Sequence, residues 1–204
     1  MGRNLAFAGR FDYNPAPLRR LYIRNQVAMQ VILDSLQIEQ VIDELAARIV
    51  SDLGPEAPLA AIGIRSRGEV LAQRLSQRLS KQLGRDVPCG TLDITLYRDD
   101  LNSPRGAAQP QVRTTEIGFD IDDKVIILVD DVLYTGRSAR AAMDALIDLG
   151  RPKAIKLAVL VDRTVGREFP IQADYAGYNS HAKAGQLVQV RFVESDGVDE
   201  VVVE

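Results

Sequence analysis

The sequence predicts an α/β protein with a mostly parallel central sheet flanked by helices. Continuous apolar runs, typical of strands that are covered on both faces, occur at 59–64, 124–129 and 155–161. Segments with the apolar spacing of helices lie between these runs, and strands that alternate with helices are typical of parallel sheets. The chain has 204 residues, a length that suits one domain.

The first predicted elements are the apolar stretch VILD at 31–34 and a helix over 35–53. Asp34 or Ser35 is the expected N-cap, and Gly54–Pro55 is the expected stop. The apolar residues of this helix recur at helical spacing and are Ile38, Val41, Ile42, Leu45, Ile49, Val50 and Leu53.

Three segments are predicted after the apolar run at 59–64. An amphipathic helix is predicted over 68–84, ending at Gly84, and a further strand over 87–97. The long polar segment 98–116 is predicted to be a loop, because it lacks any apolar periodicity. Loops of that length inside compact domains are usually functional lids or disordered.

A β-α-β unit completes the predicted sheet, with a helix that runs through Leu149–Gly150 between two apolar strands. Shorter strand-like pieces follow, notably 187–194 and 198–203. The chain shows no internal repeat and no linker, so we expect residues 29–204 to form a single domain.

Residues 1–28 show neither helical nor strand periodicity and are predicted to be a poorly ordered arm. Met29 stands directly before the first structured segment, so the arm is read either as an upstream misassigned start or as a basic arm for nucleic acid. Five arginines against one aspartate give the arm a charge of +4, which leaves −7 for the rest of a chain whose total is −3. This balance argues against a generally basic nucleic-acid binder.

Composition excludes several classes of protein. No apolar run is long enough for a membrane span and no secretory signal is visible, so we expect a cytoplasmic protein. Cys89 is the single cysteine and is expected to be a packed side chain. His181 lies in a polar loop without a metal-spaced partner, so we assign it no ligand or catalytic role.

The stretch VIILVDDVLYTGRSARAAMDAL, from Val125 to Leu146, carries the chemistry. Asp130 and Asp131 are expected just past the strand end at Val129, at the edge of the sheet where ligands bind. A turn into the next helix follows, formed by Thr135, Gly136, Arg137 and Ser138. Exposed N–H groups and the helix dipole suit such a turn to a phosphate, and its glycine lets the backbone approach closely.

Acids beside a phosphate cradle narrow the choice of ligand. Adjacent carboxylates suit vicinal hydroxyls or a metal ion and would repel a second phosphate. The predicted ligand is therefore a ribose 5-phosphate. The alternative is that the acids only cap the following helix.

The same stretch resembles the phosphoribosyl-diphosphate (PRPP) signature of type I phosphoribosyltransferases, in which apolar residues and two acids lead into a Thr-Gly-rich phosphate loop. Here the signature consists of Val125, Ile126, Ile127, Leu128, Val129, Asp130, Asp131, Val132, Leu133, Tyr134, Thr135, Gly136 and Arg137. Together with LDITLYRDDL (92–101), AVLVDR (158–163) and PIQADYAG (170–177), it is similar to the PyrR family of pyrimidine operon regulators that are also uracil phosphoribosyltransferases. The likeness runs from about Val31 to the C-terminus and implies a type I phosphoribosyltransferase fold with a small hood.

The resemblance implies a role for each part of the site. Asp130 and Asp131 would be catalytic, and the diphosphate loop would be Ser66-Arg67-Gly68, where Ser66 could also cap a helix. Further substrate contacts are implied for Arg98, Val132, Leu133, Tyr134, Thr135, Gly136, Arg137, Ser138, Arg163 and Val188. Arg98 would be the hinge of the loop that closes over the reacting centre, whereas Arg163 and Val188 would flank the base pocket. The segment DRTVGREFPI after the fifth strand is one residue longer than the family pattern.

The implied reaction converts uracil and PRPP into UMP and diphosphate, with Mg²⁺ arriving on PRPP rather than on a dedicated set of protein ligands. The implied second role is UMP-responsive regulation of pyrimidine operon transcription through mRNA binding, by a homodimer or larger oligomer. The alternatives are a nucleotide-sensing RNA-binding attenuator with little transferase activity, and a catalytically idle sensor of PRPP or UMP.

One feature opposes RNA binding by the first helix. Residues 38–53 carry four acids against one arginine, a local charge of −3, and acids repel phosphates. The remaining candidates for RNA contact are Arg74, Arg78, Arg85, Arg163 and Arg167.

Overall fold

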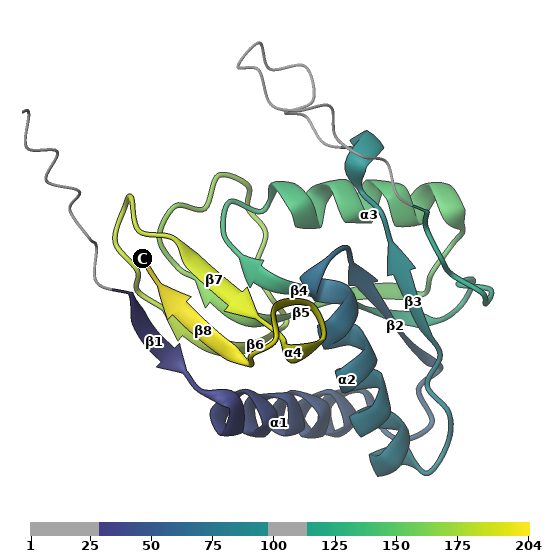
Figure 1. The fold of residues 1–204 in the computed structure, drawn as a ribbon. Coiled ribbons are helices and arrows are strands. Elements are labelled where there is room, and N and C mark those ends of the chain that lie inside the picture. The colour runs from purple at the N-terminus through teal and green to yellow at the C-terminus, as the bar shows by residue number, and fades with distance from the viewer. Residues whose placement is uncertain (1–28, 98–113) are drawn as a thin grey trace, which may run out of the picture.

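In the computed structural model, which describes residues 29–97 and 114–204, a five-stranded parallel sheet forms the centre of the molecule (Figure 1). Its strand order is β3-β2-β4-β5-β6, and every neighbouring pair is parallel. The strands are β2 (Leu59–Ile64), β3 (Cys89–Leu92), β4 (Val125–Leu133), β5 (Ala154–Arg163) and β6 (Tyr175–Ser180). The prediction of an α/β fold with a mostly parallel sheet is confirmed. The arm at 1–28 and most of the 98–116 segment, Arg98 included, lie outside the described residues.

Helices cover both faces of this sheet. Helices α1 (Ser35–Leu53) and α2 (Arg67–Leu83) bury their apolar sides in one core, and α3 (Arg137–Leu149) packs into a second core on the opposite face. Asp34 is the N-cap of α1, because its side chain accepts a hydrogen bond from the Gln37 amide (2.9 Å) while the Gln37 side chain accepts one from the Asp34 amide (2.9 Å). None of the helices in the described part of the chain is long and apolar enough to cross a membrane.

A small antiparallel sheet forms the hood. Its order is β1-β8-β7, with β1 at Gln30–Leu33, β7 at Val188–Arg191 and β8 at Glu200–Val203. The short helix α4 (Val193–Asp196) connects β7 to β8. The fully buried Phe192, which precedes α4, joins the hood to the core beneath α1 and α2.

Two local predictions are wrong, and one strand was not predicted. Strand β3 is shorter than 87–97, because the chain turns into a 3₁₀ helix over Thr95–Tyr97. Strand β6 lacks a continuous apolar run and was not predicted, since it is an edge strand whose middle residues are partly exposed. Cys89 is exposed rather than packed, because it begins the other edge strand.

Candidate active site

The two adjacent acids lie within β4, not beyond its end. The pairing of β4 with β2 stops at Val129, whereas its pairing with β5 continues to Leu133. Asp130 and Asp131 therefore occupy the part of β4 that extends past β2, with one edge uncovered at the carboxyl end of the sheet. The predicted location at that edge is confirmed, but the predicted strand end at Val129 is wrong.

Burial governs the charge state of this acid pair. It raises the pKa of Asp130 well above its ordinary value, and the neighbouring charge of Asp131 adds to the effect. Burial also raises the pKa of Asp131, opposed by hydrogen bonds from Asp130 and Val132 and by the charge of Arg67. The Asp130 carboxylate accepts a hydrogen bond from the Asp131 amide (3.0 Å). A ligand that donates hydrogen bonds to the two carboxylates, as two sugar hydroxyls do, would stabilise this pair.

The first turn of α2 rests directly on the acid pair, and Gly68 permits this approach. A Cβ at Gly68 would lie 2.6 Å from the Val129 carbonyl oxygen and 3.3 Å from Oδ1 of Asp130. Just before α2, the peptide bond between Arg65 and Ser66 is cis. Ser66 is the N-cap residue of α2, as the alternative expected, but its side chain makes no capping hydrogen bond.

The predicted phosphate turn opens α3. Gly136 is its N-cap residue with φ of 91°, a left-handed conformation that favours glycine, and the preceding Thr135 hydroxyl accepts a hydrogen bond from the Arg137 amide (3.3 Å). The Thr135 carbonyl accepts hydrogen bonds from the amides of Glu168 (3.0 Å) and Phe169 (3.1 Å), which fixes the turn against the segment after β5. Arg137 forms an ion pair with Glu168 at the rim of the turn (2.5 Å).

A pocket of about 240 Å³ brings these parts together. Its lining residues are Ile64, Arg65, Ser66, Arg67, Asp93, Ile94, Thr95, Asp130, Asp131, Val132 and Ser138. Six predicted site residues therefore line one pocket, from three segments of the chain. Arg65 and the residues of 93–95 were not predicted, although LDITLY had been singled out for its resemblance. The adjacency of β3 and β2 was the missing information, because it brings the end of β3 to the same sheet edge.

Thr95 and Asp93 form a rigid wall of this pocket. The Asp93 carboxylate accepts hydrogen bonds from the Thr95 amide (3.0 Å) and hydroxyl (2.6 Å). Five further predicted substrate contacts do not line this pocket; these are Leu133, Tyr134, Thr135, Gly136 and Arg137.

Arg163 and Val188 are not among the residues that line this pocket. The Arg163 side chain is buried, with 3 % of the residue exposed, and its guanidinium lies 3.9 Å from the centre of the Tyr134 ring. Its Nη2 donates a hydrogen bond to the Lys183 carbonyl (3.2 Å), while its Nε has no hydrogen-bond partner among the described residues. The Val188 side chain is buried in the core beneath the hood.

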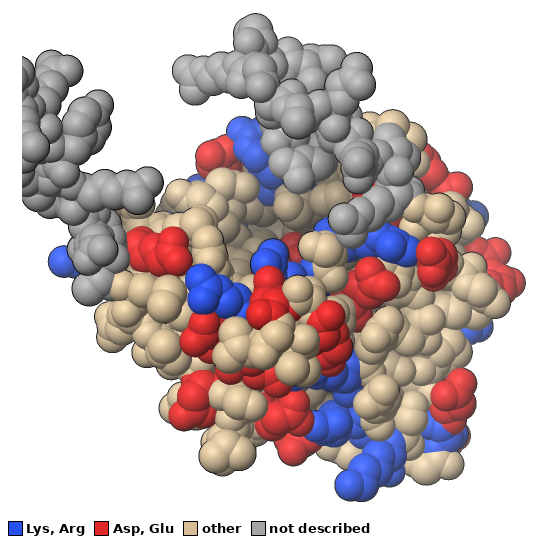
Figure 2. All heavy atoms as spheres, viewed as in Figure 1, with Lys and Arg blue, Asp and Glu red and all other residues tan. Residues whose placement is uncertain are grey.

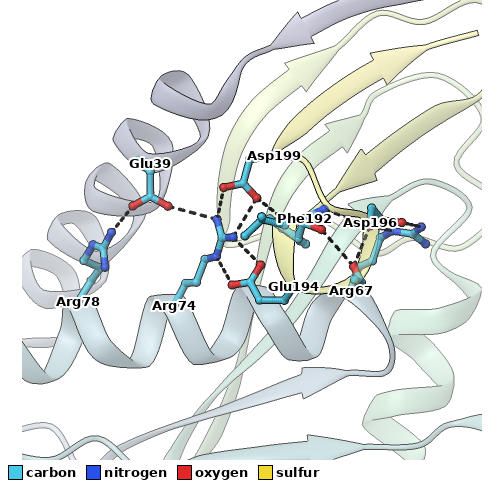
Figure 3. A network of polar contacts seen from close by, with 10 residues as sticks. Glu39, Arg67, Arg74, Arg78, Phe192, Glu194, Asp196 and Asp199 are labelled. Atoms are coloured by element: carbon cyan, nitrogen blue, oxygen red, sulfur yellow. Dashed lines mark hydrogen bonds and ion pairs between the residues drawn. The ribbon is translucent and has the colours of Figure 1, made fainter.

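All five arginines considered for RNA contact have partners within the chain. Arg74 and Arg78 both pair with Glu39 of α1, as Figure 3 shows. Arg85 donates to backbone carbonyls of Pro55 and Ala57, and Arg167 pairs with Asp162. Figure 2 shows basic and acidic side chains interleaved on the face formed by α1, α2 and the hood, rather than gathered into a basic patch.

Comparison with known proteins defines the class. The family model of the phosphoribosyl transferase domain matches residues 29–192. A hypoxanthine phosphoribosyltransferase from Staphylococcus aureus superposes with a TM-score of 0.64 at 19% identity, covering 84% of this chain and 90% of that one. The enzyme from Trypanosoma cruzi gives 0.63 at 20% identity, covering 85% and 95% of the two chains. The fold is that of a type I phosphoribosyltransferase.

Sequence relatives narrow this class. Proteins named "Bifunctional protein PyrR" from Deinococcus deserti and Thermus aquaticus are 51% identical over 170 residues and 48% identical over 170 residues. Each alignment covers 83% of this chain, and 91% and 92% of the respective relative. The chain belongs to the PyrR family of phosphoribosyltransferases, which confirms the resemblance seen in its motifs.

Proposed function

We propose that the protein is a uracil phosphoribosyltransferase that converts uracil and PRPP into UMP and diphosphate. The observation that carries this proposal is the acid pair of β4, which lies in one pocket with the diphosphate loop before α2 and with Ser138 from the first turn of α3. This shared pocket supports neighbouring subsites for the diphosphate, the ribose hydroxyls and the 5-phosphate of PRPP.

Each part of the pocket has a distinct task in this proposal. The carboxylates of Asp130 and Asp131 accept hydrogen bonds from the ribose hydroxyls and stabilise the positive charge that develops on the ring as the C1–diphosphate bond breaks. Ser66 and Arg67 hold the leaving diphosphate, because a guanidinium suits phosphate oxygens. Amides at the start of α3, with Ser138, hold the 5-phosphate.

The pocket also suits Mg²⁺ that enters on PRPP. The described residues contain no group of three histidine, cysteine or acidic side chains placed to hold a metal, so diphosphate oxygens and water would supply most ligands. Asp93, Asp130 and Asp131 line the pocket and could each offer a carboxylate oxygen to such an ion or to its water ligands. Mg²⁺ would neutralise the diphosphate and make it a better leaving group.

Arg163 is the proposed determinant of base choice. It is a buried cation that no described acid pairs with, and its Nε is an unused hydrogen-bond donor. If this donor faces the C4 position of the base, the O4 carbonyl of uracil can accept its hydrogen bond, whereas the amino group at C4 of cytosine cannot. Val188 of the hood and Arg98, which lies outside the described residues, remain proposed substrate contacts.

A regulatory role through pyrimidine-operon mRNA is the second candidate. It is supported by the word "Bifunctional" in the names of the relatives. Two acids of α1, Glu39 and Asp43, form ion pairs with arginines of α2. RNA that docked on this helix would therefore meet carboxylates and would have to compete with these ion pairs for the arginines. We therefore expect weaker binding than in a typical family member, and binding that does not depend on α1. A dimer or larger oligomer in the cytoplasm is part of this proposal.

An assay with PRPP, Mg²⁺ and each free base tests the proposal, alongside a titration of pyrimidine-operon leader RNA at two salt concentrations. UMP formed from uracil is the expected product, and Asp131→Asn is the matched control with an impaired site. Turnover of a purine base with none from uracil would refute the assigned substrate. RNA binding without any transfer would favour the attenuator alternative.

A further inference from the structure

Helix α2 presents three arginines, Arg67, Arg74 and Arg78, to the hood and to α1 (Figure 3). The surroundings of Arg74 differ from those of Arg67. Arg74, in the middle of the helix, is a buried anchor with only 11% of its side chain exposed. It forms paired hydrogen bonds with Glu194 (2.9 and 2.6 Å) and Asp199 (3.0 and 2.9 Å), and its guanidinium lies 4.9 Å from the Phe192 ring centre. These contacts hold the hood on α2 independently of the pocket.

Arg67, at the pocket end of α2, pairs with Asp196 of α4. Its Nη2 donates to Oδ1 (2.8 Å) and its Nε to Oδ2 (3.3 Å), so the carboxylate occupies one two-donor edge of the guanidinium. Arg67 also lines the pocket, its charge lowers the pKa of Asp131, and 39% of its side chain is exposed. Its guanidinium is therefore accessible to a ligand in the pocket.

Asp196 is itself held in place. Its Oδ2 accepts hydrogen bonds from the Phe192 amide (3.1 Å) and the Ser195 hydroxyl (2.7 Å). The hydrogen bond from Arg67, foremost, lowers the pKa of Asp196 to about 2, so the carboxylate is charged at neutral pH. The charged carboxylate of Asp196, which belongs to the hood, is thus held against Arg67 of the proposed diphosphate loop.

We propose that Asp196 sets the affinity of this site for diphosphate, because it competes with the diphosphate group for Arg67. The inference rests on the proposed function, which assigns Arg67 to that group. A diphosphate that approaches the pocket meets an arginine whose charge is already balanced, and it meets a carboxylate that repels it. Binding of PRPP exchanges the Asp196 contact for a diphosphate contact. The same competition favours release of the diphosphate product, while Arg74 keeps the hood attached.

Asp196→Asn tests this inference without removing the hood contacts. The amide oxygen can still accept from the Phe192 amide, whereas the new NH₂ group cannot accept from Arg67. Glu194→Gln is the matched control, because it weakens a neighbouring hood contact to Arg74 rather than to Arg67. Thermal melting of both variants verifies that each is folded.

The measurement is calorimetric titration of inorganic diphosphate with Mg²⁺ into the full chain, with UMP formation assayed in parallel. We expect Asp196→Asn to bind diphosphate about three- to ten-fold more tightly, the range expected for loss of a half-exposed ion pair, and Glu194→Gln to bind as the wild type does. Unchanged or weaker binding by Asp196→Asn, or equal tightening in both variants, would overturn the inference. If the wild type binds diphosphate but forms no UMP, the proposed reaction fails while the competition can still be read from the two affinities. If neither the wild type nor Asp196→Asn binds diphosphate, both the proposed reaction and the proposed competition are refuted.

Discussion

Replacing Gly68 with alanine tests how closely α2 must approach the acid pair. The added Cβ would lie 2.6 Å from the Val129 carbonyl oxygen and 3.1 Å from the Asp130 Cα, and both are backbone atoms that cannot rotate away. Ordinary contact begins at 3.4 Å, so the start of α2 must retreat from β4 by about 0.8 Å. Overpacking of this kind costs about 1–3 kcal/mol of unfolding free energy.

The same retreat moves the diphosphate loop away from the acids. A displacement of about 1 Å at a reacting centre can cost on the order of 10²-fold in rate, so we expect kcat/KM for PRPP to fall by about 30- to 100-fold. Gly118→Ala is the control, because a Cβ there meets no atom within 4 Å, and it should leave activity and melting temperature unchanged. Steady-state kinetics and thermal melting measure both effects. A Gly68→Ala protein with the kcat/KM of the wild type would refute this account of the site.

The remaining predictions concern the acid pair, the anchor of the hood and the N-terminal arm. Asp131→Asn keeps the shape of the site but removes a charge aimed at the ribose, so kcat/KM should fall on the order of 10²-fold with an unchanged melting temperature or a higher one; unchanged kinetics would exclude the carboxylate from the transition state. Because burial raises the pKa of Asp130, acidification from neutral pH toward its ordinary value of 3.8 should lower kcat while stabilising the free fold. Protonated Asp130 stabilises the fold, and this stabilisation is lost as pH rises through the pKa of Asp130 in the folded protein. Asp130→Asn should therefore flatten that part of the curve of stability against pH. A curve identical to that of the wild type would contradict the raised pKa of Asp130. Arg74→Ala leaves its acidic partners unpaired and should lower the free energy of urea unfolding by about 3 kcal/mol. The control is Arg140→Ala, which breaks an exposed ion pair with 55% and 52% of the two side chains accessible and should cost less than about 0.5 kcal/mol. Equal losses of unfolding free energy in the two variants would show that Arg74 is no anchor. A chain that starts at Met29 should melt and turn over as the full chain does, and a clearly lower melting temperature would show that residues 1–28 support the fold.

Local signals in the sequence were sufficient for most of the fold. The capping residue Asp34, the fully apolar run of β2 and the helical spacing of α2 depend on neighbours within a few positions, so they can be read without tertiary structure. The acid pair and the phosphate turn were predicted for the same reason, since one contiguous stretch contains both. Strand β6 escaped prediction because its role as an edge strand is set by its partner β5 and not by its own residues.

The tertiary structure alone decided which charges are available to a ligand. The sequence made Arg74 and Arg78 candidates for RNA contact, yet both are paired with acids from other elements. Arg67 was predicted to belong to a diphosphate loop and lines the pocket, but its partner Asp196 lies 129 positions further along the chain. Asp93 reaches the pocket only because β3 lies beside β2. A sequence specifies which side chains carry charge, whereas the distance between two charges, which determines their interaction energy, exists only once the chain has folded.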